Sequence, residues 1–460
     1  MRTSLYPLQN MQLSLSLKSQ FLTHKNFIEV MSHDHKRVQK IIDRIESQIS
    51  PEEFVEQIAP RSAEEVKELE DYAYPMGYSK ENQNQRIDFL NQNNIRINHL
   101  SNPTEIDQVE SLKGNIENFI GMAQIPVGLA GPILINGTNA VGDFFVPLAT
   151  SEGALVASYN RGMKACRLSG GISAMCTAES VQRSPFFKFD SMGIMGLFVK
   201  WVHEHLDNFK NVVSESSNYA QLNEMRTNVE GNSVILTFDY FTGDASGQNM
   251  VTICTDNVCK YILDNFPHKP IEWYIESNYS GDKKATSLSF SSSRGKKVTS
   301  EIVLLKDVVN HVLKTTPKAI ADYWQSSTLG VVQSGAIGAQ GHVANGLAAL
   351  FIACGQDVAC VSESSVGITR MEVTAQGDLY VALTLPSLIV GTIGGGTKLP
   401  TQNECLKMMD CAGVGKAKKF AEICCAVALS GEISIAAAMS AGHFTRAHES
   451  LGRNKGDAGK

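Results

Sequence analysis

An aspartate stands at the end of a long uncharged stretch of this chain. Between Asp322 and Asp357 the sequence contains no Asp, Glu, Lys or Arg. Apolar and small residues recur at helical intervals from His342 to Gln356, which predicts a buried helix with Asp357 just beyond its end. A carboxylate in a dry environment must be paired, hydrogen-bonded or protonated, because an unpaired buried charge is strongly destabilising. The alternative is an ordinary helix end at which Asp357 faces water.

Two other segments contain the cation and the second acid that such a site would need. The loop 281–286 has two adjacent lysines, Lys283 and Lys284, directly after Asp282. Glu152 stands at the start of a predicted helix, where the helix dipole favours a carboxylate. Taken alone, these features are equally typical of a solvated basic turn and of an ordinary first-turn glutamate. They indicate a site only if the fold brings them together with Asp357.

Length and composition describe an ordinary globular protein. The chain has 460 residues, of which 43% are apolar and 19% are charged, so two or three domains are expected. A net charge of -6 offers no general attraction to nucleic acid or to an anionic membrane surface. The apolar stretch from Ala421 to Gly442 is interrupted by Glu432, so no transmembrane helix is predicted.

The ten cysteines form no CxxC pair and lie mostly in apolar runs. This pattern favours neither a zinc site nor a disulfide framework, and no metal site is predicted. We therefore expect a soluble protein of the reducing cytoplasm, without a nucleic-acid or membrane partner.

The order of the expected elements gives three regions. Residues 1–110 are expected to be an accessory helical region, with helices at 35–50 and from Ser62, followed by Asn- and Gln-rich loops at 82–94. From Asn115 a strand-and-turn pattern leads to a helix that begins near Gly153 and can be capped by Thr150 or Ser151. Its expected inward residues are Ala154, Val156, Ala157 and Met163.

From Arg183 to Ser280 the pattern reads strand, helix, strand twice over, which suggests a small ferredoxin-like unit inserted in a larger domain. The predicted fold class is therefore α+β, with a helix-rich catalytic domain at 111–182 and 276–460 and a dinucleotide-binding insertion at 183–275. No GxGxxG follows a strand, and GGGTK at 394–398 has the reverse order of a nucleoside triphosphate loop.

Nine short motifs occur in one order along most of the chain, from about Asn115 to Arg453. This set resembles the 3-hydroxy-3-methylglutaryl-CoA (HMG-CoA) reductase family, and IPVGLAGP and ATSEG are similar to the class that includes eukaryotic enzymes. The resemblance implies reduction of a thioester to mevalonate, with two NAD(P)H consumed and free CoA released. The motifs are ENFIG, IPVGLAGP, PLATSEG, NRG, GDASGQNM, DKK, GQD, GTIGGGT and AGHFTRAH.

The resemblance also implies the catalytic residues. Lys283 would stabilise the negative charge that develops on the thioester oxygen, because a fixed ammonium favours an oxyanion. Asp357 would orient Lys283 and Glu152, and Glu152 would protonate the aldehyde oxygen in the second reduction. His448 would protonate the departing CoA thiolate.

Binding residues follow from the same matching. Family active sites form between two subunits, so the resemblance implies a homodimer as the minimum assembly, with Asn345 near the Lys283 amine. The implied HMG-CoA-binding residues are Ser158, Asn160, Arg161, Lys164, Arg183, Ser277, Lys284 and Asn345. The implied dinucleotide-binding residues are Ser217, Asn218, Asp244, Ala245, Ser246, Gly247, Gln248 and Asn249.

Two positions depart from the family pattern. Asn218 occupies the place of an arginine that meets the 2′-phosphate in NADPH-using relatives, so NADPH is expected with a reduced preference over NADH. Glu276 occupies the place of a serine that faces the substrate carboxylate. We expect the loop to shift so that Ser277 supplies the hydroxyl and Glu276 turns to solvent or to a lysine. The alternatives are a reductase of another branched acyl-CoA and a catalytically silent protein that binds CoA thioesters.

Overall fold

The computed structural model describes residues 39, 42, 43, 45, 47–69, 79–98, 100, 112, 114–118 and 122–442. His443, His448 and most of the helix expected at 35–50 lie outside this part. The chain divides into two compact units, residues 1–51 and 52–460. The account that follows concerns the second unit.

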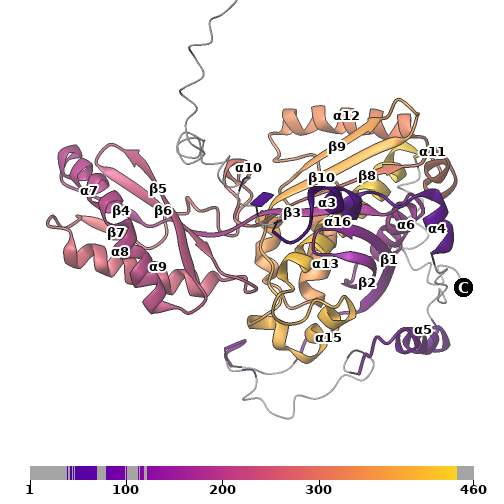
Figure 1. Ribbon diagram of the computed structural model, residues 1–460, viewed down its shortest axis with the longest axis horizontal. Helices are drawn as coiled ribbons and strands as arrows, with labels where there is room; N and C mark the ends of the chain where they lie inside the picture. The colour runs from indigo at the N-terminus through magenta and orange to yellow at the C-terminus, as the bar shows by residue number, and fades with distance from the viewer. Residues whose placement is uncertain are drawn as a thin grey trace, which may run out of the picture. The chain divides into compact units, whose positions relative to one another are not determined.

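The described strands form one hydrogen-bonded network of two sheets that share β3 (Figure 1). The larger sheet has the order β2-β1-β3-β8-β10-β9; its pairs are antiparallel except for β1 and β3. The end of β3, at Val181–Arg183, pairs instead with β6 of the smaller sheet. The strands of the larger sheet are β1 Val127–Gly137, β2 Val141–Ala149, β3 Ile172–Arg183, β8 Gly295–Leu304, β9 Ile368–Val373 and β10 Leu379–Leu388.

Helix α16 (Ala417–Ser440) is the central helix of this core, because it packs on β3, β8 and β10 and also contacts α6 and α13. Every residue of α16 from Phe420 to Ser434 is buried, so this part of the helix has no side that faces solvent. By length and composition α16 is the one described helix that could cross a membrane, yet 83% of its apolar window is buried inside the protein. The other helices around this sheet are α6 Leu155–Leu168, α11 Lys306–Val308, α12 Pro317–Ser334, α13 Val343–Ala353, α14 Val361–Ser364 and α15 Pro400–Met408.

The shorter helical turns are α10 Leu288–Ser291, η2 Val309–Leu313, η3 Val358–Cys360 and η4 Gly395–Lys398. Helix α6 approaches α16 so closely that a β-carbon added at Gly162 would lie 1.9 Å from the Ser430 carbonyl oxygen. Only glycine allows this backbone contact, and it brings the polar side chains of α6 next to those of α16.

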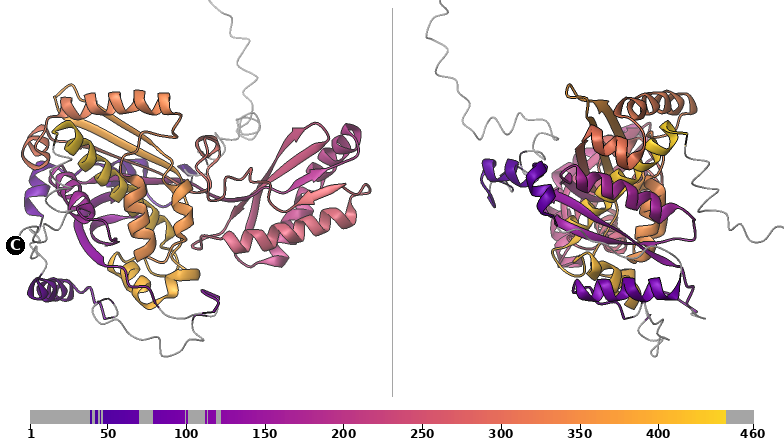
Figure 2. Two further views of the ribbon diagram at one scale, coloured as in Figure 1. Left: turned by 180° about the vertical axis from the view of Figure 1, so that it is seen from behind. Right: turned by 90° about the vertical axis from the view of Figure 1, so that its right-hand side faces the viewer.

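The smaller sheet has the order β7-β4-β6-β5, and helices α7, α8 and α9 pack against it around a separate aromatic core (Figures 1 and 2). The sequence pattern predicted β4, β6, β7 and α9, but it gave a single helix where the structure has α7 and α8, and it missed β5, whose polar residues hid it. Its elements are β4 Phe186–Lys188, α7 Met192–Glu204, α8 Leu206–Ser216, β5 Gln221–Glu230, β6 Ser233–Phe241, α9 Gln248–Asn265 and β7 Glu272–Tyr274.

Near the N-terminus the structure confirms one local prediction and corrects another. Ser62 caps the helix Ala63–Glu68 in a reciprocal arrangement with Glu65, as its acidic first turn indicated. The segment 82–94, expected as loops, belongs mainly to the helix α5, because Ser79 caps it and Leu90 is buried. Its Asn and Gln side chains cover the solvent side. The described helices of this region are α3 Pro51–Ile58, α4 Ala63–Glu68 and α5 Lys80–Gln92.

The start of α6 also differs from the prediction. The helix begins at Leu155, and Ala154 precedes it in a left-handed conformation without a side-chain cap. The Thr150 hydroxyl instead accepts a hydrogen bond from the Glu152 N–H. Met163 points inward as expected, but Ala157 is exposed, because the helix is rotated relative to the predicted face. The described chain is a mixed helix and sheet protein, in agreement with the predicted class.

Candidate active site

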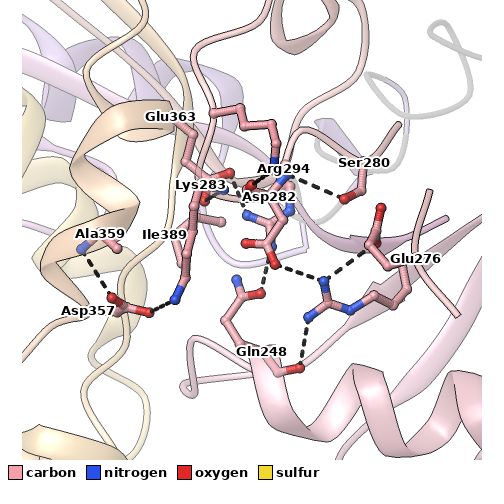
Figure 3. A network of polar contacts seen from close by, with 12 residues as sticks. Gln248, Glu276, Ser280, Asp282, Lys283, Arg294, Asp357, Ala359, Glu363 and Ile389 are labelled. Atoms are coloured by element: carbon pink, nitrogen blue, oxygen red, sulfur yellow. Dashed lines mark hydrogen bonds and ion pairs between the residues drawn. The ribbon is translucent and has the colours of Figure 1, made fainter. Parts of the chain in front are cut away.

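Lys283 and Asp357 meet in the structure, as the sequence suggested they should (Figure 3). The Lys283 Nζ lies 2.8 Å from Asp357 Oδ2. Their hydrogen bond and the charge of Asp357 raise the pKa of Lys283, so the amine stays protonated at neutral pH. Asp357 is also held by its other oxygen, which accepts a hydrogen bond from the Ala359 N–H at 3.1 Å. The pair can therefore present an ammonium group in a fixed position.

This pair is more open to solvent than a dry helix end would imply. The side chains of Lys283 and Asp357 are 46% and 39% exposed. Helix α13 before them is buried on most sides, which confirms the helix but not the burial of its terminal carboxylate. The turn that follows α13 at Gly355, where φ is positive, turns the chain outward before Asp357.

A second cluster, centred on two buried arginines, lies behind the lysine loop. The Arg294 guanidinium, 2% exposed, pairs with Glu363 and lies 2.8 Å from Asp282 Oδ1. Its Nη2 also donates to Gln248 Oε1 at 2.5 Å. Burial acts to raise the pKa of Asp282, but Arg294 and Arg183 outweigh burial and hold the pKa below its usual value.

Sequence reasoning missed Arg294 and Glu363. Arg294 is the single charged residue in the run Ala285–Gly295, and such isolation is the signal that pointed to Asp357. Glu363 is buried, and its pKa is raised by burial against the opposing effect of Arg294. Both belong to the same polar network as the lysine loop (Figure 3).

Arg183, expected to meet the substrate carboxylate, already faces two carboxylates. Its Nη1 lies 2.8 Å from Asp282 Oδ2 and 3.5 Å from Glu276 Oε2. The expectation that Glu276 turns to solvent or to a lysine is wrong: its Oε2 also accepts a hydrogen bond from the Ser184 N–H. The Arg183 guanidinium compensates the negative charge of the Glu276 carboxylate, which is partly buried and therefore poorly solvated.

The Ser277 hydroxyl is engaged as well. It donates to the Ser184 carbonyl oxygen at 2.7 Å, and the Ser277 N–H donates to the same atom at 2.9 Å. Lys284 turns back on its own loop, because its Nζ donates to the Asp282 carbonyl at 2.9 Å. In this structure the Ser277 and Lys284 side chains therefore stabilise the loop on either side of Asp282.

Glu152 and Asn345 form a separate pair. The Asn345 Nδ2 lies 3.5 Å from Glu152 Oε2, and Glu152 is exposed. Asn345 belongs to the first turn of α13, whereas Asp357 lies beyond its end. A helix of 11 residues is about 16 Å long. Within one chain, the Glu152–Asn345 pair and the Lys283–Asp357 pair are thus held at opposite ends of α13, and Asn345 is not beside the Lys283 amine.

A buried glutamate anchors the N-terminus of α13. The Glu432 carboxylate accepts hydrogen bonds from the N–H groups of Gly341, His342 and Val343 at 3.1, 2.6 and 2.9 Å. Burial raises the pKa of Glu432 to about 7, against the opposing effect of these three hydrogen bonds. The Tyr159 hydroxyl donates to the His342 carbonyl at 2.5 Å, which further fixes the start of the helix.

The residues expected to contact CoA lie along α6, and two of them, Ser158 and Arg161, contact Ser434 of α16. Arg161 donates from Nε and Nη2 to the Ser434 hydroxyl and from Nη2 to its carbonyl, at 3.1, 2.9 and 2.7 Å. Burial lowers the pKa of Arg161. Ser158 contacts the same Ser434 hydroxyl at 3.0 Å, and Asn160 accepts from the Gly131 N–H at 2.9 Å. Lys164, one turn further along α6, is exposed.

The expected dinucleotide residues lie at the start of α9 and the end of α8. Gly247, with φ 77°, precedes α9 and leaves the N–H groups of its first turn without side-chain caps. The Asp244 carboxylate accepts hydrogen bonds from the N–H groups of Gly415 and Ala417 at 2.7 and 3.1 Å. It therefore caps the N-terminus of α16. Ala245 and Ser246 connect it to Gly247, and Asn249 is exposed.

At the end of α8, the Ser217 hydroxyl accepts hydrogen bonds from the N–H groups of Tyr219 and Ala220. Asn218 is exposed beside it. Within the described ranges, no group of three or more His, Cys, Asp or Glu residues has the arrangement of a metal site. All ten cysteines lie in the described part as buried free thiols.

Comparison with known proteins places this geometry in context. The sequence profile described as hydroxymethylglutaryl-coenzyme A reductase matches residues 82–453. The 3-hydroxy-3-methylglutaryl-coenzyme A reductase of Pyrococcus horikoshii is 42% identical over 367 residues, which cover 78% of this chain and 88% of that protein. The enzyme of the same name from Aeropyrum pernix is 44% identical over 356 residues, covering 76% and 84%.

The fold has a solved counterpart. The class II 3-hydroxy-3-methylglutaryl-CoA reductase from Streptococcus pneumoniae, bound to NADPH in open conformations, aligns with a TM-score of 0.63 at 16% identity. The alignment covers 82% of this chain and 100% of that chain. At this level of identity the match concerns the fold.

Proposed function

The chain belongs to the hydroxymethylglutaryl-coenzyme A reductase family, and from this premise we propose that it reduces HMG-CoA to mevalonate and free CoA with two NADPH. The observation that carries the proposal is the Lys283–Asp357 ion pair at 2.8 Å. It joins two motifs 74 positions apart in the sequence (357 − 283) that the family resemblance assigns to one catalytic cluster.

Lys283 acts on the oxygen of the thioester. As carbonyl carbon becomes tetrahedral, negative charge grows on this oxygen, and a fixed ammonium stabilises it more than it stabilises the ground state. Asp357 keeps the amine protonated and oriented, in line with the raised pKa of Lys283. When bound, NADPH supplies the hydride in each of the two reductions.

Glu152 and His448 donate the protons that the aldehyde oxygen and the CoA thiolate take up. Glu152 donates a proton to the aldehyde oxygen in the second reduction, and its contact with the Asn345 amide orients the carboxyl group. His448 protonates the CoA thiolate as it leaves; this residue lies outside the described part of the chain. The α6 residues Arg161, Asn160, Ser158 and Lys164 bind CoA, as the resemblance implies.

The start of α9 has features that fit a dinucleotide phosphate. Its first turn presents uncapped N–H groups after Gly247, and helix N-termini favour anions. The Gln248 Nε2 is buried there without a hydrogen-bond partner, which leaves a donor for a ligand. We assign the small unit, residues 183–275, to dinucleotide binding and to a ferredoxin-like arrangement, supported by the strand order β7-β4-β6-β5 with helices in both crossovers.

The cofactor choice is NADPH, with NADH as a weaker substrate. Asn218 lacks the charge of an arginine, and the Ser217 hydroxyl is partly engaged by two backbone N–H groups. The ratio of kcat/KM for NADPH to that for NADH is therefore expected to exceed one. The preference should be smaller than the one that a bidentate arginine contact, worth roughly 1.5–3 kcal/mol, would give. A ratio below one would overturn this choice.

The working assembly is a homodimer whose active sites contain residues of both chains. Support comes from the separation of the Glu152–Asn345 and Lys283–Asp357 pairs at the two ends of α13 in one chain. Two chains related by a two-fold axis can bring the first pair of one chain to the second pair of the other. We further propose a cytoplasmic enzyme, consistent with ten buried free thiols, in which residues 1–110 form an accessory region.

A second candidate function follows from one observation, the pairing of Glu276 with Arg183. A carboxylate in this place competes with the terminal carboxylate of HMG-CoA, so the chain would instead reduce another branched acyl-CoA without that group. A catalytically silent CoA-thioester-binding protein is the third candidate, and the intact Lys283–Asp357 pair argues against it.

The decisive experiment measures NADPH oxidation by the purified full chain with HMG-CoA, together with the product. We expect two NADPH consumed per HMG-CoA and equal amounts of mevalonate and free CoA. Methyl-branched acyl-CoA thioesters without a terminal carboxylate serve as the comparison substrates. Preference for these would favour the second candidate, and binding without oxidation of NADPH would favour the third.

A further inference from the structure

The backbone of Lys283 is held by Glu363, a residue outside the lysine loop. Lys283 has φ 57°, in the left-handed region that costs a residue with a β-carbon roughly 1–2 kcal/mol. Its N–H donates to Glu363 Oε1 at 3.1 Å. Because the φ of Lys283 sets the direction of its side chain, this hydrogen bond helps to determine where the amine points.

Glu363 can serve as this acceptor only because Arg294 holds its other oxygen. Glu363 and Arg294 are 3% and 2% exposed in their side chains, so neither is held in place by water. Arg294 Nη2 also reaches Asp282, the residue directly before Lys283, at 2.8 Å. The guanidinium thus fixes the lysine loop twice, once through Asp282 and once through Glu363 (Figure 3).

We propose that the buried Arg294–Glu363 ion pair is a positioning device for the Lys283 ammonium, which holds the lysine loop so that the amine lies against Asp357. Neither residue touches the reacting atoms. The proposal rests on the proposed function in so far as Lys283 is the catalytic lysine. The Gln248 contact of Arg294 adds the start of α9 to the same support.

A purely structural role would produce a different pattern. Breaking a buried ion pair by removing one partner is strongly destabilising, whereas replacing both partners by apolar residues of similar volume is often neutral. If the pair only fills the interior, the double replacement restores both stability and activity. If it positions Lys283, the double replacement restores stability alone, because the Lys283 N–H remains without its acceptor.

The first test needs no catalytic activity. Competitive acetylation with acetic anhydride at pH 8, followed by peptide mass spectrometry, reports how readily each lysine loses its proton and reacts. The Glu363→Ala variant should hold the Lys283–Asp357 pair less firmly. We therefore expect its Lys283 to react with acetic anhydride at least threefold faster than Lys283 of the wild type. Lys318, paired with Asp322 on the exposed side of α12, is the internal reference and should not change. An unchanged rate at Lys283 would overturn the proposal.

The second test separates position from stability. For Arg294→Met combined with Glu363→Leu, thermal unfolding should return close to that of the wild type. The kcat for HMG-CoA should remain at least tenfold lower, with KM within about twofold. The matched control is Arg167→Met with Asp143→Leu, which removes another partly buried pair, joined by two hydrogen bonds of 2.9 Å, from the far end of α6. This control should retain its kcat.

Three further outcomes of these experiments can be distinguished. A double variant with wild-type kcat would overturn the positioning role. If Glu363→Ala fails to fold, Glu363→Gln retains an acceptor for the Lys283 N–H but removes the charge, and it should show a smaller increase in Lys283 acetylation. If the wild type does not reduce HMG-CoA while Lys283 still reacts faster in Glu363→Ala, the proposed function fails and the positioning role stands.

Discussion

Individual side chains at this site are set by charge partners that are distant in the sequence. The Lys283 ammonium is paired with Asp357, and the Lys283 N–H donates to Glu363. Arg183 is held between Asp282 and Glu276. A substitution at each of these contacts removes a different interaction, so some substitutions should change mainly kcat and others mainly KM.

The roles proposed for Lys283, Asp357 and Glu152 belong to the transition state. We expect Lys283→Ala, Asp357→Asn and Glu152→Gln each to lower kcat by about 10²-fold or more, with KM for HMG-CoA changed only modestly. Steady-state kinetics at saturating NADPH, with circular dichroism to verify folding, would measure this. A variant that raised KM and left kcat unchanged would assign its residue to binding instead.

The role proposed for His448, protonation of the CoA thiolate, belongs to only one of the two reductions. His448→Gln should slow the reduction of HMG-CoA more than that of mevaldehyde, because no thiolate leaves in the second reaction. Parallel assays with the two substrates compare the steps directly. Equal losses in both assays would contradict the role of His448 in protonating CoA.

The carboxylate beside Arg183 should weaken binding of an anionic acyl group. Glu276→Gln keeps an acceptor for the Ser184 N–H but removes a negative charge 3.5 Å from Arg183. We expect KM for HMG-CoA to fall about fivefold, equivalent to roughly 1 kcal/mol for a partly exposed charge. The control Glu272→Gln removes an exposed carboxylate paired with Lys188 and should have no effect. A rise in KM would show that Glu276 helps to bind the substrate.

At the scale of elements, helix termini position the site. Asp244 from the loop before α9 caps α16, and Glu432 from α16 caps α13. The start of α13 in turn holds Asn345 next to Glu152. Changes at these caps should therefore affect stability and activity together.

Glu432 makes the stability of the fold depend on pH. Its pKa is about 7 in the folded protein against 4.5 for a free glutamate, so the folded state binds the proton more tightly. The associated stability is present below about pH 4.5 and is lost as pH rises to about 7, by up to roughly 3 kcal/mol.

The glutamine in Glu432→Gln cannot titrate, so the variant should lack the loss of stability that deprotonation of Glu432 causes between about pH 4.5 and 7. Denaturant unfolding of both proteins at pH 5, 6, 7 and 8 measures the effect. We expect the stability of the wild type relative to the variant to decrease between pH 5 and 7 and to level off above pH 7. A difference that is constant with pH would contradict the raised pKa.

At the scale of the whole molecule, the Glu152–Asn345 pair and the Lys283–Asp357 pair lie at opposite ends of α13 in one chain. Helix α13 separates them by a length that no side chain spans. The aromatic core of the small sheet and the aliphatic core around α16 are separate as well, joined through β3. Arg183 lies at the end of this shared strand, where the two sheets meet.

Subunit mixing tests the composite site. Glu152→Gln and Lys283→Ala chains, each inactive alone, are unfolded, mixed in equal amounts and refolded together. If each site takes Glu152 from one chain and Lys283 from the other, random pairing should recover about a quarter of the wild-type activity. Two copies of the same variant, treated identically, are the control. No recovery from a mixture whose refolding is confirmed would mean that one chain supplies both residues.

The sequence alone determined much of this protein, and for local reasons. Helical spacing predicted α13, alternation predicted β6, and Ser62 with the acidic first turn after it predicted the start of α4. Motif order led to the family, and the family resemblance implied that Asp357 orients Lys283. The local pattern failed at 82–94, where polar Asn and Gln residues concealed a helix, and at β5, where they concealed a strand.

Tertiary structure decided which polar groups meet. No pattern within a few residues could reveal that Arg294 joins Glu363 to Asp282, since Arg294 and Glu363 are 69 positions apart. Nor could it show that Glu276 faces Arg183, or that α13 holds Glu152 and Lys283 apart in one chain. Secondary structure follows from local spacing and propensity, whereas the pairing of buried charges follows from the packing of whole elements, because each buried charge needs whichever partner the fold brings within reach.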